Sequence, residues 1–122
     1  MRRTIIFAVF FLPVLCSGQK HYDFNAVCQQ AYHSIVQLKL EEGRRLLDEE
    51  KRRDPGNLIP YFLDNYIDFF QLFFNEDATQ YAAWKDRRDQ RLDLMSQGPE
   101  GSPWNLFTRS LIHFQWAAIQ IK

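Results

Sequence analysis

The sequence predicts an all-α fold, and three observations support that class. Apolar residues recur at spacings of three and four through most of the chain after residue 22, which is the period of an amphipathic helix. No segment alternates apolar and polar residues with the period of two that is typical of a strand. Clusters of Pro, Gly, Asn and Asp separate the periodic segments, so we expect four or five helices arranged as antiparallel hairpins.

Residues 23–53 contain two helical registers. Asp23 can cap the first helix. Its apolar stripe is formed by Phe24, Val27, Ala31, Ile35 and Leu38. A second apolar register starts at Leu40, and its phase differs from the first near Lys39, which favours a tight turn between two helices. One long bent helix is the alternative, because no Gly, Pro or Asn marks the turn.

A stop signal, Asp54-Pro55-Gly56-Asn57, precedes the most apolar helix of the chain, which starts at residue 58. Pro55 cannot continue a helix, and Asn57 can cap the next one. The polar residues of that next helix form one narrow stripe on a helical wheel: Asp64, Asp68, Gln71 and Asn75. We expect the stripe to reach water and the other sides to pack against neighbours. A membrane span is disfavoured, because residues 58–74 would extend about 25 Å and place two Asp near the centre.

Two further helical regions are predicted beyond residue 75. Asp77 follows a polar break and can cap the first of them, whose apolar edge consists of Tyr81, Trp84, Leu92 and Met95. Residues 85–91 alternate in sign, which indicates a solvated face with surface ion pairs rather than a nucleic-acid stripe. After a loop over residues 98–103, Ser102 and Pro103 start the last helix. Its predicted inner face consists of Trp104, Phe107, Leu111, Phe114, Ala118 and Ile121.

Residues 1–18 have the pattern of a secretory signal peptide. Arg2 and Arg3 form a positive n-region, residues 4–15 form an apolar h-region, and small residues permit cleavage after Gly18. Twelve helical residues span only about 18 Å, too short for a retained anchor. Lipid attachment at Cys16 is the alternative, but the residue before it is not the small one that a lipoprotein signal requires. We expect export of residues 19–122 to the periplasm or the cell exterior.

The expected mature chain is close to neutral, because removal of two Arg leaves 13 Lys and Arg against 15 Asp and Glu. No basic excess favours a nucleic acid or an anionic membrane as its partner. The mature chain retains a single cysteine, Cys28. It therefore has no internal disulfide and depends on packing for its stability. Cys28 lies on an apolar helix face, where a buried and unreactive thiol is expected.

No constellation of residues specifies a reaction, a cofactor or a metal site. His21, His33 and His113 are scattered and form no metal-binding motif. Asp64 and Asp68 lie one helical turn apart, and paired carboxylates can serve acid–base chemistry. On so apolar a helix we instead expect these two residues to face solvent or to pair with nearby Arg. The sequence thus predicts a segment that is not an enzyme and needs no cofactor.

Residues 40–69 resemble a tetratricopeptide repeat, from the second helix of one repeat into the first helix of the next. The matching positions are Leu40, Glu42, Gly43, Pro55, Asn57, Tyr61 and Tyr66. The segment after residue 18 is similar to uncharacterised exported tetratricopeptide-like proteins of Bacteroidota. The resemblance implies a right-handed stack of helical hairpins that binds proteins and carries no active site. The chain departs from the family at Gly43, where Ala is usual, and at the long loop over residues 98–103.

Two large apolar side chains of the last helix, Ile112 and Trp116, lie among its polar residues on the helical wheel. Another loop or helix of this chain can cover them. The alternative that we favour is a partner or inter-repeat surface, with the chain as the N-terminal part of a longer array. Helical repeats need stacked neighbours and a polar terminal cap, so the segment alone is expected to self-associate.

The expected function is that of an exported helical-repeat scaffold that mediates protein–protein interaction in the cell envelope. Its partner would be another protein or further repeats of the same chain. Two alternatives stay open: a helical accessory domain of a longer secreted enzyme, and an aromatic-rich helical domain that binds a glycan or a lipid. The last alternative requires several aromatic side chains exposed together, whereas their helical spacing places most of them in the core.

Overall fold

The computed structural model describes residues 18–121, so nearly all of the expected signal peptide lies outside the described part of the chain. The described residues form six helices and a single isolated β-bridge, which confirms the all-α class. The helices are α1 (Ala26–Val36), α2 (Leu40–Arg53), α3 (Ile59–Asn75), α4 (Ala78–Trp84), α5 (Arg87–Met95) and α6 (Pro103–Ile121).

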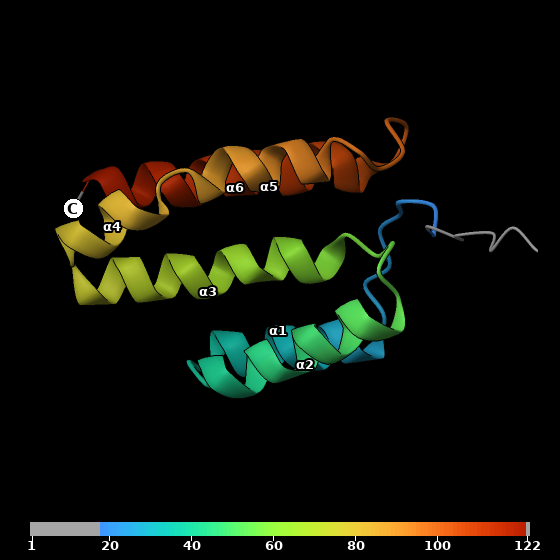
Figure 1. Cartoon of the computed structure of the whole chain (residues 1–122), viewed down its shortest axis with the longest axis horizontal. Coiled ribbons are helices and arrows are strands. Elements are labelled where there is room, and N and C mark those ends of the chain that lie inside the picture. The colour runs from blue at the N-terminus through green and yellow to red at the C-terminus, as the bar shows by residue number, and fades with distance from the viewer. Residues whose placement is uncertain (1–17, 122) are drawn as a thin grey trace, which may run out of the picture.

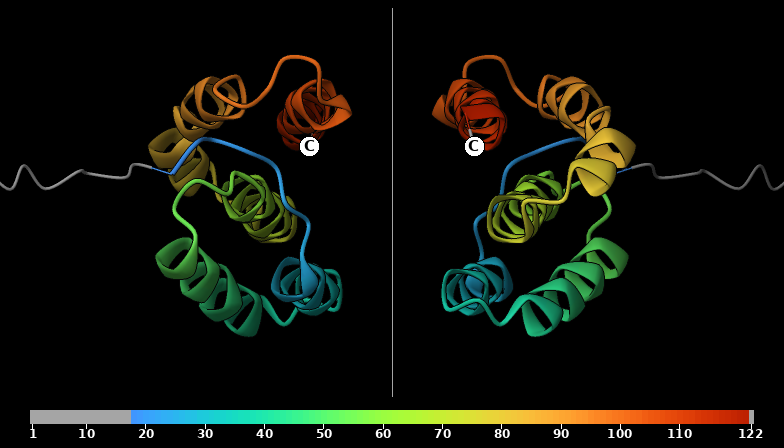
Figure 2. Two further views of the ribbon diagram at one scale, coloured as in Figure 1. Left: turned by 90° about the vertical axis from the view of Figure 1, so that its right-hand side faces the viewer. Right: turned by 90° about the vertical axis from the view of Figure 1, so that its left-hand side faces the viewer.

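The long helices run back and forth, and α3 lies in the middle of the molecule (Figure 1). Helices α1 and α2 pack on one side of α3, and α5 and α6 pack on the other. Seen along the helix axes, α1 and α6 flank one face of α3, whereas α2 and α5 flank the opposite face (Figure 2). Helix α3 contacts all four of these neighbours, which confirms the prediction that it packs on several sides.

Residues 26–53 form two helices, not one bent helix. The chain turns at Leu38, whose φ of 62° is left-handed even though the residue is not glycine. The Leu38 N–H donates to the Ile35 carbonyl at 2.9 Å, and the Lys39 N–H donates to the Ser34 carbonyl at 2.9 Å. These bonds satisfy carbonyls at the end of α1 that the helix itself leaves free. The turn is therefore closed by backbone hydrogen bonds, without the residues that usually mark one.

Gly43 of α2 packs against Ile35 of α1. A Cβ atom at this position would lie 2.5 Å from Cγ1 of Ile35 and 3.2 Å from its Cδ1. Both contacts are shorter than carbon atoms tolerate without movement. The departure from the usual Ala at this position thus has a local cause, the size of the Ile35 side chain.

The helix cap predicted at Asp77 is confirmed, whereas α1 is capped by Asn25 and not by Asp23: the Asn25 side chain accepts from the Cys28 N–H at 3.1 Å. Asn57 lies one residue before Leu58, the N-cap of α3, and its side chain still binds the first turn. The Asn57 Oδ1 atom accepts from the Ile59 N–H at 3.1 Å. The Asp77 Oδ1 atom accepts from the N–H groups of Thr79 at 2.9 Å and Gln80 at 3.2 Å. Each side chain satisfies N–H groups that the first turn of a helix leaves without partners.

The chain between residues 78 and 95 is divided into α4 and α5, a break that its apolar spacing does not indicate. Lys85 and Asp86 separate the two helices. Immediately after the break, the Arg87 guanidinium lies 4.0 Å from the centre of the Trp84 ring. This cation–π contact holds the first turn of α5 against the last turn of α4.

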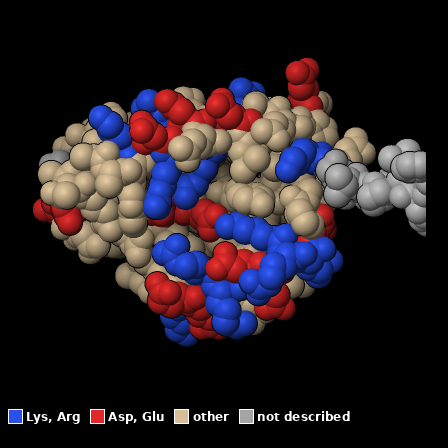
Figure 3. Space-filling model, in the orientation of Figure 1, with Lys and Arg blue, Asp and Glu red and all other residues tan. Residues whose placement is uncertain are grey.

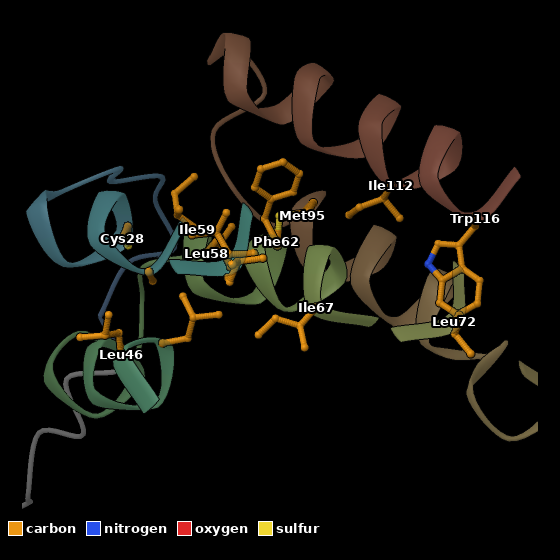
Figure 4. Close-up of a cluster of buried hydrophobic side chains, with 14 of the residues drawn as sticks. Cys28, Leu46, Leu58, Ile59, Phe62, Ile67, Leu72, Met95, Ile112 and Trp116 are labelled. Atoms are coloured by element: carbon orange, nitrogen blue, oxygen red, sulfur yellow. The ribbon is translucent and has the colours of Figure 1, made fainter. Parts of the chain in front are cut away.

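The hydrophobic core follows α3 along its length and contains side chains from every long helix (Figure 4). The members buried to 1% exposure or less are Cys28, Ala31, Ile35, Leu47, Leu58, Ile59, Leu63, Ile67, Met95 and Ile112. Burial of an aliphatic side chain of this size stabilises the fold by about 1.5–3 kcal/mol. The core therefore unites α1 and α2 with α3, α5 and α6.

The segment before α1 ties the two halves of the molecule together. The His21 N–H donates to the Gly56 carbonyl at 3.0 Å, and the His21 carbonyl accepts from the Leu58 N–H at 2.8 Å. The Tyr22 hydroxyl donates to the Met95 carbonyl at the end of α5. Gly98 lies against the Tyr22 ring, and a Cβ there would come within 2.3 Å of ring carbon. A larger residue at position 98 would therefore displace this tie.

Candidate interaction surface

The polar stripe of α3 reaches water fully only at Asn75, contrary to the expectation from its sequence, because Asp68 is buried and Asp64 and Gln71 are partly covered. Asn65 and Asp68 are 1% and 2% exposed. Both Oδ atoms of Asp68 accept from Nη1 of Arg87 at 3.0 Å, and Oδ2 also accepts from Nη1 of Arg91 at 2.6 Å. The interpretation of residues 85–91 as a purely solvated face is corrected in the same way, because two of its arginines turn inward to pair with Asp68. The other option for the two Asp residues, pairing with nearby Arg, is confirmed for Asp68.

A second acidic residue of the same stripe, Asp64, pairs with α2. Its Oδ2 atom lies 2.5 Å from Nζ of Lys51. Burial raises the pKa of the Asp64 carboxyl above its usual value, and Lys51 acts in the opposite direction. Both acidic residues are thus engaged in ion pairs within the helix stack.

Asn65, which is also a polar residue of α3, helps to orient α6. The Asn65 Oδ1 atom accepts from Nε1 of Trp116 at 2.9 Å, and the Asn65 amide donates to Oε1 of Gln115 at 2.6 Å. Asn105, at the other end of α6, donates from its amide to the Gly98 carbonyl at 3.2 Å. These hydrogen bonds allow the polar side of α6 to be buried, because a buried polar group without a partner would cost free energy.

Ile112 and Trp116 lie on this inner side of α6, at 0% and 2% exposure. Both point from α6 toward α3 (Figure 4). Other helices of the chain cover them. This is the less favoured of the two alternatives that the sequence analysis gave for Ile112 and Trp116. Ile112 and Trp116 therefore do not form an exposed surface for a partner.

The face of α6 that was predicted to be inner is largely outer. Phe107, Phe114 and Ile121 are 51%, 66% and 87% exposed, and only Trp104, Leu111 and Ala118 of that stripe are partly covered. Leu106 is also 67% exposed. Exposed apolar residues gathered on one helix differ from the scattered ones of an ordinary surface and indicate an interaction site.

Aromatic side chains of three helices meet in one groove beside this stripe. We define the aromatic groove by the residues that line it: Phe24, Tyr32, Phe62, Leu63, Tyr66, Trp104 and Phe107. Ring centres of Tyr32 and Tyr66 are 5.6 Å apart, and those of Phe62 and Phe107 are 6.0 Å apart. Phe24 bridges the walls, with its ring centre 6.2 Å from Tyr32 and 5.8 Å from Trp104. The groove encloses about 240 Å³.

The aromatic groove carries no charged side chain among its lining residues. Burial raises the pKa of the Tyr66 hydroxyl to about 12, and the neighbouring Tyr32 adds to that effect. Tyr66 is therefore neutral at any physiological pH. In contrast, Lys, Arg, Asp and Glu side chains gather over α2 and α5 on the face that Figure 3 displays. The molecule thus has one charged face and one aromatic, uncharged groove.

A second hollow lies where α3, α4 and α6 end. It encloses about 380 Å³ and is lined by Leu72, Glu76, Asp77, Ala78, Tyr81, Ile119 and Gln120. The Gln120 amide donates to the Tyr81 hydroxyl at 2.9 Å across it, and Asp77 is already used as a helix cap. The polar groups of this hollow therefore serve the local structure, and no candidate function is assigned to it.

Cys28 is buried, and burial raises the pKa of its thiol to about 12, as expected for an unreactive cysteine. Among residues 18–121, no group of His, Cys, Asp or Glu is arranged to hold a metal ion. No helix in the same part of the chain has the length and apolar character needed to span a membrane.

In comparisons with known proteins, no family model, no curated protein and no solved structure matches the chain. The aromatic groove therefore rests on the structure alone. Sequence reasoning missed it because it assigned most aromatic residues to the core. The signal that could have found it is the absence of charge on α6, where Arg109 is the single charged residue within 103–121.

Proposed function

We propose that this chain is an exported helical scaffold that binds an apolar helical segment of another protein in its aromatic groove. The observation that carries the proposal is the meeting of Tyr32, Tyr66 and Phe107 from α1, α3 and α6 in one uncharged groove. Aromatic side chains that are exposed together are the usual anchors of protein–protein interfaces. Charged side chains are depleted at the centres of such interfaces.

The size of the groove favours side chains of a protein over a separate small ligand. Pockets for cofactors and drug-sized ligands usually enclose about 300–1,000 Å³, whereas the groove encloses about 240 Å³. That volume suits one or two apolar side chains. An amphipathic helix presents such side chains at regular intervals along one face. The partner segment that we propose is therefore a helix with uncharged, apolar anchor residues.

The arrangement of the hairpins is consistent with a tetratricopeptide-like stack, which we propose as the repeat architecture. Helices α1 and α2 form one hairpin, and α3 with α4 and α5 forms the next, while α6 starts a third (Figure 1). Helices α1, α3 and α6 contribute to the same groove. Solenoids of this kind create extended binding surfaces from equivalent helices of successive repeats.

The proposed export can be tested separately from binding. The signal-peptide pattern predicts that an exported chain begins at Gln19. Expression of the full chain in a bacterium, followed by fractionation and intact-mass measurement, determines both the location and the first residue. A full-length mass in the cytoplasmic fraction would contradict export.

Site-specific photo-crosslinking tests the binding proposal. A benzophenone amino acid replaces Tyr32 in the groove or, as the matched control, Arg45 on the charged face, whose side chain is 64% exposed. After irradiation of intact cells, peptides bound to each position are sequenced by mass spectrometry. We expect the Tyr32 position alone to capture one recurrent protein, through an apolar helical segment. Equal capture at both positions, capture of a lipid or glycan, or no adduct at Tyr32 would contradict the proposal.

A further inference from the structure

The apolar stripe of α6 follows a heptad spacing along the whole helix. Its members alternate in steps of three and four residues: Trp104, Phe107, Leu111, Phe114, Ala118 and Ile121. A stripe of this period packs best against another helix whose side chains interlock with it. Within residues 18–121, no other helix covers the outer part of the stripe, because Phe107, Phe114 and Ile121 are each more than half exposed.

The stripe is complementary to itself when two copies of α6 run antiparallel. Trp104 then lies opposite Ile121, Phe107 opposite Ala118, and Leu111 opposite Phe114. The midpoint of every pair falls between residues 112 and 113. One two-fold axis therefore relates all the pairs, as an isologous interface requires. The bulky Phe107 meets the small Ala118, so each layer joins a larger side chain to a smaller or flexible one.

The surroundings of the stripe also permit close approach of a second copy. Ser110 and Ala117 are exposed next to it and are small. The single charged residue of α6, Arg109, is half-buried, and its Nε donates to the Asn105 carbonyl at 3.1 Å. Two copies of this face thus meet without like charges, which would oppose pairing. The charged surfaces of α2 and α5 offer no such uncharged area (Figure 3).

We propose that two copies of this chain associate through antiparallel α6 helices about a two-fold axis near residues 112 and 113. The paired helices are about 28 Å long, which gives an interface near the lower limit for specific association, about 1,200 Å² in total. Association at micromolar concentrations follows. The inference goes beyond the proposed function and does not depend on it. Because Trp104 and Phe107 belong to both surfaces, pairing competes with a partner for the groove.

Paired cysteines test the register of this dimer. The full chain is expressed for export and purified with Phe107→Cys and Ala118→Cys together, and each substitution is also prepared alone. The double variant places each cysteine opposite the other type in the second copy. In the single variants, equivalent cysteines are about 16 Å apart along the helices. The same distance prevents a bond within one helix.

Mild oxidation should convert the double variant into a covalent dimer, with at least about tenfold more product than either single variant. Unmodified protein is the control for the buried Cys28. Sedimentation velocity of the unmodified chain should show a dimer at about 100 µM, with dissociation on dilution. Phe114→Glu should abolish it, whereas Phe74→Glu, which is exposed but lies on α3, should not. A monomer at every concentration, or equal cross-linking of single and double variants, would overturn the proposal.

Discussion

Asp68 and Arg91 form an ion pair inside the helix stack, with Oδ2 of Asp68 2.6 Å from Nη1 of Arg91 and side-chain exposures of 3% and 15%. Arg87 binds the same carboxylate at 3.0 Å. These contacts link the middle of α3 to α5. The pair also lies beside Asn65, which binds Arg91 at 3.2 Å and Trp116 at 2.9 Å. One buried carboxylate therefore helps to position both α5 and α6.

Replacement of Asp68 by Ala should destabilise the chain by about 3 kcal/mol, because Arg87 and the largely buried Arg91 would both lose their carboxylate partner. Chemical denaturation monitored by circular dichroism measures the effect. Asp89→Ala is the matched control: Asp89 pairs with Arg88 at 3.1 Å, but its side chain is 71% exposed, so the loss should stay below about 0.5 kcal/mol. Equal losses for the two variants would contradict the buried role of Asp68.

Glu50 should make the stability of the fold pH-dependent. Its carboxylate accepts from Arg53 at 2.6 Å, Asn25 at 2.7 Å and Asn57 at 3.2 Å. Hydrogen bonding to Arg53 lowers the pKa of Glu50 below its usual value, despite burial. The native state therefore favours the ionised form. This contribution is complete above the pKa of the unfolded chain, about 4.3, and is lost as pH falls through the lower native pKa.

The matching experiment compares unmodified protein with Glu50→Gln between pH 3 and pH 7. At pH 7 the variant should be less stable by about 1–3 kcal/mol, because an NH2 group replaces one of the two carboxylate oxygens and cannot accept from an Arg53 donor. The difference should shrink as pH falls below the pKa of the unfolded chain, about 4.3, and through the lower native pKa, where the native carboxylate itself is protonated. A difference that stays constant down to pH 3 would show that Glu50 is not ionised in the fold.

Gly43→Ala should destabilise the chain, even though Ala favours a helix by about 0.8–1 kcal/mol over Gly. The new Cβ would lie 2.5 Å from Cγ1 of Ile35, and overpacking of this kind costs about 1–3 kcal/mol. The same substitution in an Ile35→Ala background should be neutral or stabilising, because the obstructing atoms are gone. Thermal denaturation of the four proteins gives the coupling energy. Additive effects would mean that the two residues do not touch.

The sequence predicts the helices well where local chemistry decides their limits. Asp77 caps α4 and Asn57 binds the Ile59 N–H at the start of α3, each through its own side chain, and such contacts depend on neighbouring residues alone. The turn at Leu38 is also indicated, because the apolar phase changes there. The break between α4 and α5 is not, since Lys85 and Asp86 carry no local stop signal.

The orientation of α6 could not be read from its apolar period, because two opposite faces compete for the core. One face is richer in aromatic residues, and the other combines Ile112 and Trp116 with Asn105, Thr108 and Gln115. The second face is buried because Asn65 of α3 provides hydrogen-bond partners for Trp116 and Gln115. Those partners lie fifty residues away in the sequence, so no local pattern reveals them. The aromatic groove could not be predicted for the same reason, because it depends on the orientation of α6.

The orientation of α6 is the claim on which the groove and the α6 pairing both depend, and thiol labelling tests it directly. Phe114→Cys and Ile112→Cys are compared at submicromolar protein concentration, where the chain should be monomeric, with the buried Cys28 as an internal unreactive thiol. We expect the cysteine at 114 to react at nearly the rate of an unfolded chain. The cysteine at 112 should react at least about a hundredfold more slowly, because it must wait for local opening. Equal rates, or faster reaction at 112, would contradict the outward position of the aromatic stripe.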